Sequence, residues 1–171
     1  MTRLLKSFSL LAVVAVLAVF SLAARCATPE ETAAVEALRK MFADGLYEAV
    51  DRQSTEFVKQ FPNSECLPEV WLIQARARME LGRVDDAISI LKETAERSAQ
   101  KRDEFDFWHA SALASKGDWK AAADAFGRFL DTHTNSPMRL QATYHQAHAK
   151  HRAGDTAGAI NLLSVPDGLF Q

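Results

Sequence analysis

The most restrictive feature of the sequence is a short motif that occurs four times. Each copy is a turn that contains glycine, followed by an alanine, over residues 44–49, 82–87, 117–122 and 154–159. The final alanines, Ala49, Ala87, Ala122 and Ala159, are 38, 35 and 37 residues apart. Another alanine lies twelve residues before each of them, at Ala37, Ala75, Ala110 and Ala147. Since a fixed period of 20–50 residues indicates stacked units, the chain is predicted to be a repeat protein of about four units.

Each unit is expected to be a pair of antiparallel α-helices. Glycine suits the end of a helix, which often needs a left-handed backbone, and acids such as Asp85 and Asp86 suit the start of the next helix. Small residues at matched positions let the two axes approach, and larger residues at helical spacing fill the space around them. The expected helices cover residues 30–43, 46–60, 67–81, 84–99, 103–116, 119–132, 137–153 and 156–164, and no segment alternates with the period of a strand.

The glycine–alanine turn, the paired small residues, Trp71 near the start of a first helix and Pro62 at the end of a unit together resemble the tetratricopeptide repeat (TPR) family. The resemblance extends from about residue 30 to residue 164. It implies an all-α fold over residues 28–171, a right-handed superhelix of antiparallel helix pairs. The segments Tyr47–Glu69 and Phe126–Pro137, with their loops at 61–64 and 134–137, are most similar to bacterial envelope members, such as outer-membrane assembly lipoproteins and periplasmic proteins of the Tol–Pal system.

The resemblance also implies where a partner would bind. Ligands of this family usually contact the first helix of each pair, three positions before its small residue and one after it. Carried over to this chain, and extended by one turn, these positions are Ala34, Leu38, Met41, Leu72, Arg76, Met79, Phe107, Ser111, Tyr144, His148 and His151. Such a strip suits a peptide or a helix of a protein partner. The alternative is that Leu72, Phe107 and Tyr144 pack between repeats. The lysines and asparagines of the family's carboxylate clamp are absent from these positions.

The N-terminus has the layout of a secretory signal peptide over residues 1–27. Arg3 and Lys6 precede an apolar run from Phe8 to Ala24, and Ser21–Ala23 fits a cleavage site. The alternative is an uncleaved membrane anchor, although the run is shorter than the roughly 20 residues that a spanning helix needs. The chain is therefore expected to be exported to the periplasm or cell envelope.

The sequence allows several states for its two cysteines, Cys26 and Cys66: lipidated, disulfide-bonded or free. Cys26 follows the apolar run, as the lipidated cysteine of a bacterial lipoprotein does, but Arg25 departs from the small residues expected before such a site. A disulfide with Cys66 is conceivable in an oxidising compartment, and cleavage after residue 27 would remove one partner. We favour Cys66 as a lone, small, packed residue.

Catalytic, metal and cofactor sites are not predicted. His145, His148 and His151 recur on one helix, but no HExxH motif or suitably spaced carboxylate accompanies them, and Lys150 and Arg152 oppose a cation. Paired acids fall at expected helix starts. The chain has a net charge of −2 and no basic run, which argues against nucleic acid as a partner.

The sequence therefore predicts an exported adaptor without enzymatic activity, which binds a peptide or partner helix in the groove of its superhelix and contributes to assembly of an envelope complex. The alternative is a structural segment of a longer solenoid or a self-associating repeat protein. The apolar end of the chain favours this second function, because terminal repeats normally need a polar outer face, and it predicts a homodimer through the last helix.

Overall fold

The computed structural model describes residues 28–164 of the chain, so the signal segment expected over residues 1–27 lies outside the described residues. Within them, eight α-helices and two short 3₁₀-helices occur, and there is no strand. None of these helices is both long and apolar enough to cross a membrane. The helices are α2 (Pro29–Ala43), α3 (Tyr47–Gln60), α4 (Leu67–Glu80), α5 (Val84–Thr94), η1 (Ala95–Arg97), η2 (Ala99–Lys101), α6 (Arg102–Lys116), α7 (Trp119–Thr132), α8 (Arg139–Arg152) and α9 (Thr156–Leu163).

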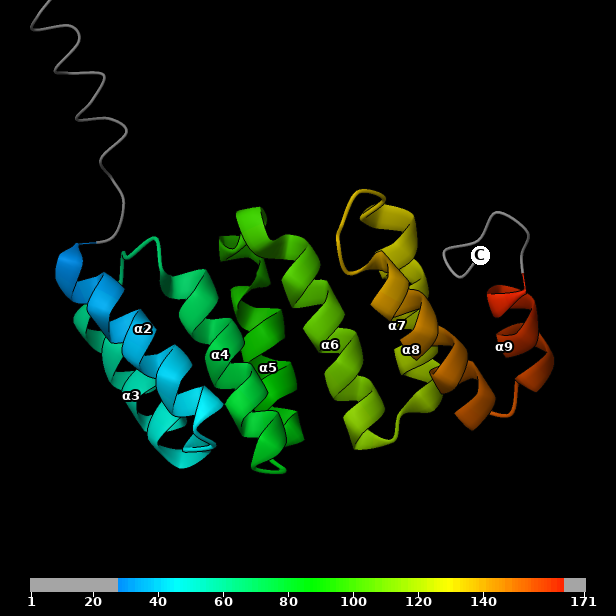
Figure 1. Cartoon of the computed structure of the whole chain (residues 1–171), viewed down its shortest axis with the longest axis horizontal. Coiled ribbons are helices and arrows are strands. Elements are labelled where there is room, and N and C mark those ends of the chain that lie inside the picture. Colours follow the sequence, from blue (N-terminus) through cyan, green and yellow to red (C-terminus); the bar gives the residue numbers. More distant parts are fainter. Residues whose placement is uncertain (1–27, 165–171) are drawn as a thin grey trace, which may run out of the picture.

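The helices stack along the long axis of the molecule (Figure 1). Consecutive helices contact one another, and in addition α2 contacts α4, α4 contacts α6 and α6 contacts α8. Four antiparallel pairs, α2–α3, α4–α5, α6–α7 and α8–α9, therefore stack through their first helices. This arrangement confirms the prediction of an all-α chain of four helix pairs. We call the surface formed by α2, α4, α6 and α8, on the side away from the second helices, the first-helix face.

The turn inside each pair has the same geometry in all four repeats. Each turn holds one glycine with a left-handed backbone, with φ between 74° and 94°. The residue after each glycine donates its backbone N–H to a carbonyl five residues earlier, as Arg83 does to Arg78 at 2.8 Å. This bond pairs a carbonyl that the helix end leaves free. The four turn glycines, Gly45, Gly82, Gly117 and Gly154, are therefore equivalent.

The connections between pairs are of two kinds. The loop after α3 and the loop after α7 share the same bonds: Ser64 and Ser136 each accept, through Oγ, the backbone N–H two residues later. The connection between α5 and α6 instead consists of η1 and η2. The helix expected over residues 84–99 thus ends at Thr94, and the turn glycines are 37, 35 and 37 residues apart because the middle connection differs.

The equivalence of the glycines corrects the register of the first repeat. Seven residues before and five residues after each of the last three turn glycines lie buried alanines, such as Ala75 and Ala87. Counted from Gly45, the same positions are Leu38 and Val50, which are also buried. Ala37, which the sequence pattern selected, is exposed instead. The first repeat therefore uses larger residues at its helix contact.

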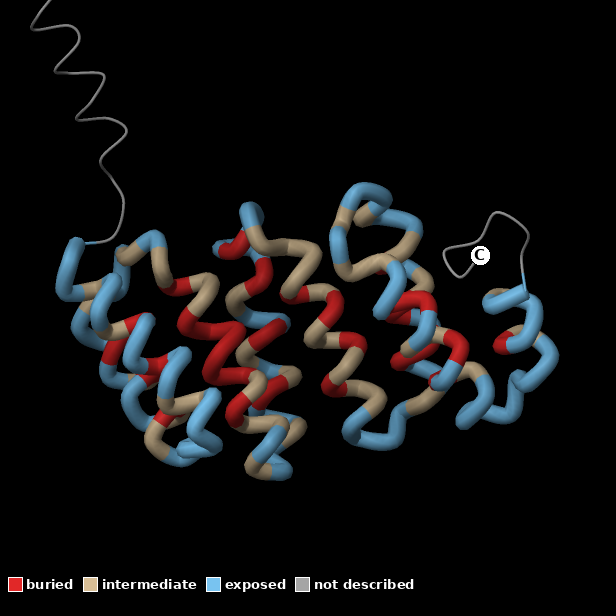
Figure 2. Tube along the Cα trace, in the orientation of Figure 1, coloured by how far each residue is buried: buried red, intermediate tan, exposed pale blue. Residues whose placement is uncertain are grey.

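Buried residues concentrate in the inner helices, whereas α2 and α9 at the two ends are largely exposed (Figure 2). The largest buried cluster joins the first two repeats and includes Phe105 and Ala112 of α6. A second cluster lies between α6, α7 and α8 and contains Phe107, Phe126 and Phe129. Each repeat thus buries its apolar side against the next repeat, as expected of a chain in which a unit contacts only its neighbours.

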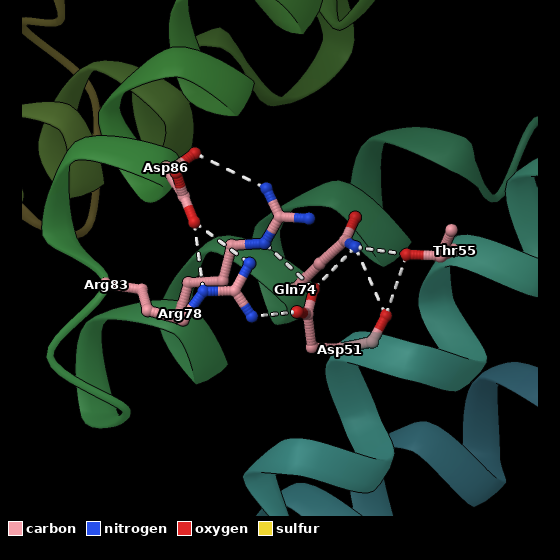
Figure 3. A network of polar contacts seen from close by, with 6 residues as sticks. All are labelled: Asp51, Thr55, Gln74, Arg78, Arg83 and Asp86. Atoms are coloured by element: carbon pink, nitrogen blue, oxygen red, sulfur yellow. Dashed lines mark hydrogen bonds and ion pairs between the residues drawn. The ribbon is translucent and has the colours of Figure 1, made fainter.

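A polar network ties the first repeat to the second (Figure 3). Asp51 of α3 accepts hydrogen bonds from Gln74 Nε2 at 2.8 Å, Arg78 Nε at 2.8 Å and an Arg83 guanidinium nitrogen at 2.6 Å. Burial raises the pKa of the Asp51 carboxyl, but these donors and the charge of Arg78 outweigh it, so its pKa lies below the ordinary value. The carboxylate is therefore ionised and satisfied inside the interface.

Candidate functional site

Seven residues of the strip expected to bind a partner, from α4, α6 and α8, fall into three groups in the structure. Leu72 and Phe107 are buried in the core, with 4% and 1% of their surface exposed. Arg76 and Ser111 are half-buried on α4 and α6. Tyr144, His148 and His151 are exposed on α8. The structure thus places the strip on one series of helices but at very different depths.

Leu72 and Phe107 pack between repeats, which is the alternative that the sequence left open. Phe107 makes edge contacts with Phe126 of α7 in its own repeat and with His145 of α8 in the next repeat, at centroid distances of 5.7 and 5.9 Å. Side chains buried to this extent cannot contact a ligand without unpacking the core. We therefore exclude both residues from the candidate surface.

Arg76 lies at the centre of the first-helix face, between side chains of the two neighbouring first helices. Its guanidinium carbon is 4.6 Å from the ring centroid of Phe42 in α2 and 4.5 Å from that of Trp108 in α6. Burial lowers the pKa of Arg76, although the charges of Glu80 and Glu104 act in the opposite direction. The cation is therefore partly desolvated and contacts two aromatic rings, an arrangement worth about 1–2 kcal/mol per ring.

Phe42 and Trp108 were not among the residues expected from the sequence. Phe42 lies three residues before its turn glycine, as Met79 and His151 do, so it takes the place that the shifted register gave to Met41. Trp108 follows Phe107 and also packs edge-on against it at 5.5 Å. With Ser111, whose hydroxyl donates to the Phe107 carbonyl within α6, these residues form the central part of the first-helix face.

A second region lies at the end of the molecule, in a groove between α8 and α9. The groove has a volume of about 240 Å³, and its lining is almost entirely apolar. Tyr144, His148 and His151 line one side, and Ile160 and Leu163 of α9 line the other. Three predicted binding residues therefore come together here, apart from Arg76 and Ser111. We call this region the end groove.

The three histidines of α8 have separate surroundings. His145 is half-buried and stacks on Phe126 at 5.5 Å, and burial together with the charge of His148 lowers its pKa. His148 contacts the ring of Trp119 at 5.7 Å, whereas His151 Nδ1 lies 3.0 Å from the Thr156 hydroxyl. Over residues 28–164, no three His, Cys, Asp or Glu side chains are grouped so that they could hold a metal ion.

Cys66 is half-buried at the start of α4 and packs against the largest core cluster. Burial raises the pKa of its thiol, and a hydrogen bond with Ser64 only partly opposes this effect. The thiol is therefore held in its neutral form, which makes it a poor nucleophile. The cysteine proposed as its disulfide partner, Cys26, lies outside the described residues.

Comparison with known proteins identifies the family. A model of the tetratricopeptide repeat matches residues 72–137 and again residues 107–165, which together span more than half of the chain. The chain belongs to the TPR family. Members of this family are typically scaffolds for protein–protein interaction without enzymatic activity, and the fold of this chain suits that role.

Solved structures show the same TPR architecture. One contains the nearly identical TPR-like repeats of a protein described as a kinesin light chain from Podosopora anserina, with a TM-score of 0.67 and 17% sequence identity. The match covers 77% of this chain and 71% of that chain. A single-substitution variant of those repeats matches with the same TM-score and 18% identity, over 77% and 70%. At such identity the likeness concerns the fold alone. No curated protein matches the sequence.

Proposed function

We propose that this chain is an exported TPR adaptor, which holds a peptide or a partner helix on its first-helix face and contributes to assembly of a cell-envelope protein complex. The observation that carries the proposal is the meeting of Phe42, Arg76 and Trp108, from three successive first helices, on one face. Half-exposed aromatic and guanidinium groups are typical of the residues that dominate binding energy at interfaces. A ligand across this face would contact three repeats at once.

A cross-linking pull-down from native cells tests the binding role. The variant Trp108→Ala/Ser111→Ala changes the first-helix face, and Lys92→Ala/Glu93→Ala is the matched control on the exposed side of α5. We expect the first variant, but not the control, to lose a defined partner while circular dichroism stays helical. Retention of all partners by the first variant would exclude the first-helix face as the binding surface.

Export is a separate part of the proposal and rests on the sequence of residues 1–27. Fusion of these residues to alkaline phosphatase, which is active only after export, should give an active enzyme. Replacement of Arg3 and Lys6 by glutamate should reduce this activity, because the positive flank is part of the export signal. An inactive fusion that remains inside the cell would refute the envelope location.

A second candidate function is self-association through the end groove. Tyr144 is 54% exposed, whereas its equivalents Leu72 and Phe107 are almost fully buried by the neighbouring repeat. Leu163 is 38% exposed, whereas its equivalents Leu91 and Phe126 are buried. The end groove therefore displays a surface that is covered in the preceding repeats.

The other end of the molecule restricts how two copies could associate. Ala77, Ala112 and Ala149 are each buried, five residues before a turn glycine. The same position in α2 is Lys40, which is exposed. Docking of α2 into the end groove of another copy would bury this charge, so the expected dimer joins two end grooves and is closed.

Sedimentation at tens of micromolar tests this dimer. We expect a dimer for the natural chain and a monomer for Leu163→Lys, whose charge would be buried at the contact. Lys120→Ala is a surface control on α7, since the Lys120 side chain is 87% exposed. A natural chain that sediments as a monomer would rule out the second function and leave the adaptor proposal intact.

A further inference from the structure

Two equivalent arginines of the first-helix face have different partners. Arg39 and Arg76 each lie six residues before a turn glycine. Arg39 Nε donates to Glu69 Oε1 of the next first helix at 2.6 Å. Glu104 is the residue equivalent to Glu69 in the following repeat, but it pairs with Lys101 Nζ at 2.7 Å. The ion pair that satisfies Arg39 is therefore not repeated at Arg76.

Arg76 makes no ion pair or hydrogen bond through its guanidinium with any residue of the range 28–164. The guanidinium carbon lies over the rings of Phe42 and Trp108, within 4.6 Å of each ring centroid. A guanidinium has five N–H donors, and contact with the face of an aromatic ring leaves these donors without an oxygen acceptor. Arg76 is thus held in place with its donors still available to a ligand.

A carboxylate is the group that best matches this arrangement. Its two oxygens can accept two parallel N–H bonds from a guanidinium, and such charge-assisted pairs are about twice as strong as neutral hydrogen bonds. The aromatic rings already fix the orientation of Arg76, so little side-chain entropy remains to be lost on binding. A neutral acceptor would leave the partly desolvated charge uncompensated.

We propose that Arg76, held between Phe42 and Trp108, binds the side-chain carboxylate of a single Asp or Glu in a partner peptide on the first-helix face. This inference rests on the proposed adaptor function and specifies the chemistry of its ligand. Glu80 and Glu104 act on Arg76 at longer range, and they would repel further acids. An isolated acid flanked by uncharged residues therefore fits the site better than an acidic run.

Selection of peptides from a random phage-displayed library on the purified full chain provides the test. Selected peptides are then synthesised with a blocked N-terminus and an amidated C-terminus, so that only side chains can supply a carboxylate. We expect a shared Asp or Glu, and its change to Asn or Gln should weaken binding about 10–100-fold, as expected for a hydrogen bond between charged groups. This comparison needs no change in the protein.

The protein variants complete a double-mutant cycle. Arg76→Gln should weaken binding of the acidic peptide by a similar factor, and it should have little further effect on the amide version of the peptide. Arg76→Lys keeps the charge but lacks the planar fork, so it should recover only part of the affinity. Arg52→Gln is the matched control, because Arg52 is exposed on α3, outside the first-helix face, and binding should be unchanged.

Each other result has a defined meaning. Selected peptides that lose binding with Trp108→Ala but share no acid, or that are insensitive to Arg76→Gln, would overturn the carboxylate site and leave the adaptor proposal standing. Binding that requires a free peptide C-terminus would also overturn it, because the carboxylate would then come from the main chain. A library that yields no peptide sensitive to any first-helix variant would refute the adaptor proposal, and this inference with it.

Discussion

Removal of the Asp51 carboxylate should uncouple the first repeat from the second. In Asp51→Ala, Gln74, Arg78 and Arg83 each lose a bond from the network of Figure 3. The Asp51 side chain is 13% exposed and that of Arg78 is 19% exposed, so the Arg78 guanidinium cannot be fully solvated in its place. The variant therefore leaves a partly buried charge without its partner.

The expected loss of stability follows from these contacts. Breaking a fully buried ion pair costs about 3–5 kcal/mol. Arg83 is 45% exposed, and water can replace its bond to Asp51, so this contact contributes little to the loss of stability. We expect Asp51→Ala to lower the free energy of unfolding by about 2–3 kcal/mol. For a chain of this size, this corresponds to a decrease in Tm of about 5–10 °C.

Urea denaturation followed by far-ultraviolet circular dichroism measures this change. The control is Asp124→Ala, which removes an ion pair with Lys120 on the surface of α7, and its effect should stay within about 0.5 kcal/mol. Amide hydrogen exchange should show that α2 and α3 open more readily in Asp51→Ala than in the natural chain.

The dependence on pH gives a second readout of the same carboxylate. The folded-state pKa of Asp51 is below its ordinary value, so the unfolded state binds more protons as pH falls through the acidic range. The stabilisation by the Asp51 carboxylate is therefore complete above pH about 5. It is lost as pH falls through the ordinary pKa of an aspartate and then through the lower pKa of Asp51 in the folded chain. The difference in unfolding free energy between the natural chain and Asp51→Asn should shrink below pH 4 or so. A free energy of unfolding for Asp51→Ala within about 0.5 kcal/mol of that of the natural chain would refute this account of the interface.

Four further substitutions have defined outcomes. Burial lowers the pKa of His145, so below pH about 6.5 the unfolded chain binds more protons than the folded chain does, and stability decreases as pH decreases. The substitution His145→Gln should reduce this loss of stability, measured by urea denaturation at neutral and mildly acidic pH. Phe107→Ala should cost about 3–5 kcal/mol, whereas Tyr144→Ala should cost less than about 1 kcal/mol, as compared by thermal unfolding. Gly117→Ala places a side chain at φ 88° and should cost about 1–2 kcal/mol, with Ser115→Ala as an exposed control near the same turn.

The sequence predicted the helices well because their ends carry local signals. The turn glycines stop each first helix, and the bonds around them involve only nearby residues. The first helix, α2, likewise begins at a capping box in which the Thr28 hydroxyl and the Glu31 carboxylate each accept the other's backbone N–H. The end of α5 was predicted five residues too late, because η1 and η2 continue the helical pattern with tighter turns.

The register of the first repeat could not be read from alanine spacing alone. Ala37 and Ala49 are twelve residues apart, but so are Leu38 and Val50, and only the position of the left-handed residue Gly45 decides between them. The one-residue shift replaced Phe42 with Met41 in the predicted binding strip. Phe42, one of the two rings that hold Arg76, was missed for this reason, and Trp108, the other ring, was not among the expected residues either.

The extent to which each residue of the first-helix face is buried was not predictable from the sequence either. The family pattern predicts on which side of its helix each residue lies, but the burial of that residue depends on how closely the next repeat approaches. Leu72 and Phe107 are covered by a following repeat, whereas Tyr144, at the same position of the last repeat, is 54% exposed. The stacking of Arg76 between two helices depends on contacts across three repeats, and such contacts leave no signal at a fixed sequence spacing.

The most direct test of the central proposal is site-specific photo-cross-linking in intact cells. A photoreactive amino acid is placed at Ser111 on the first-helix face, and at Glu93 on the exposed side of α5 as the control. The adaptor proposal predicts a discrete cross-linked partner from position 111 and none from position 93, and Arg76→Gln should weaken the cross-link from position 111. A partner captured from position 93 but not from position 111 would contradict binding on the first-helix face.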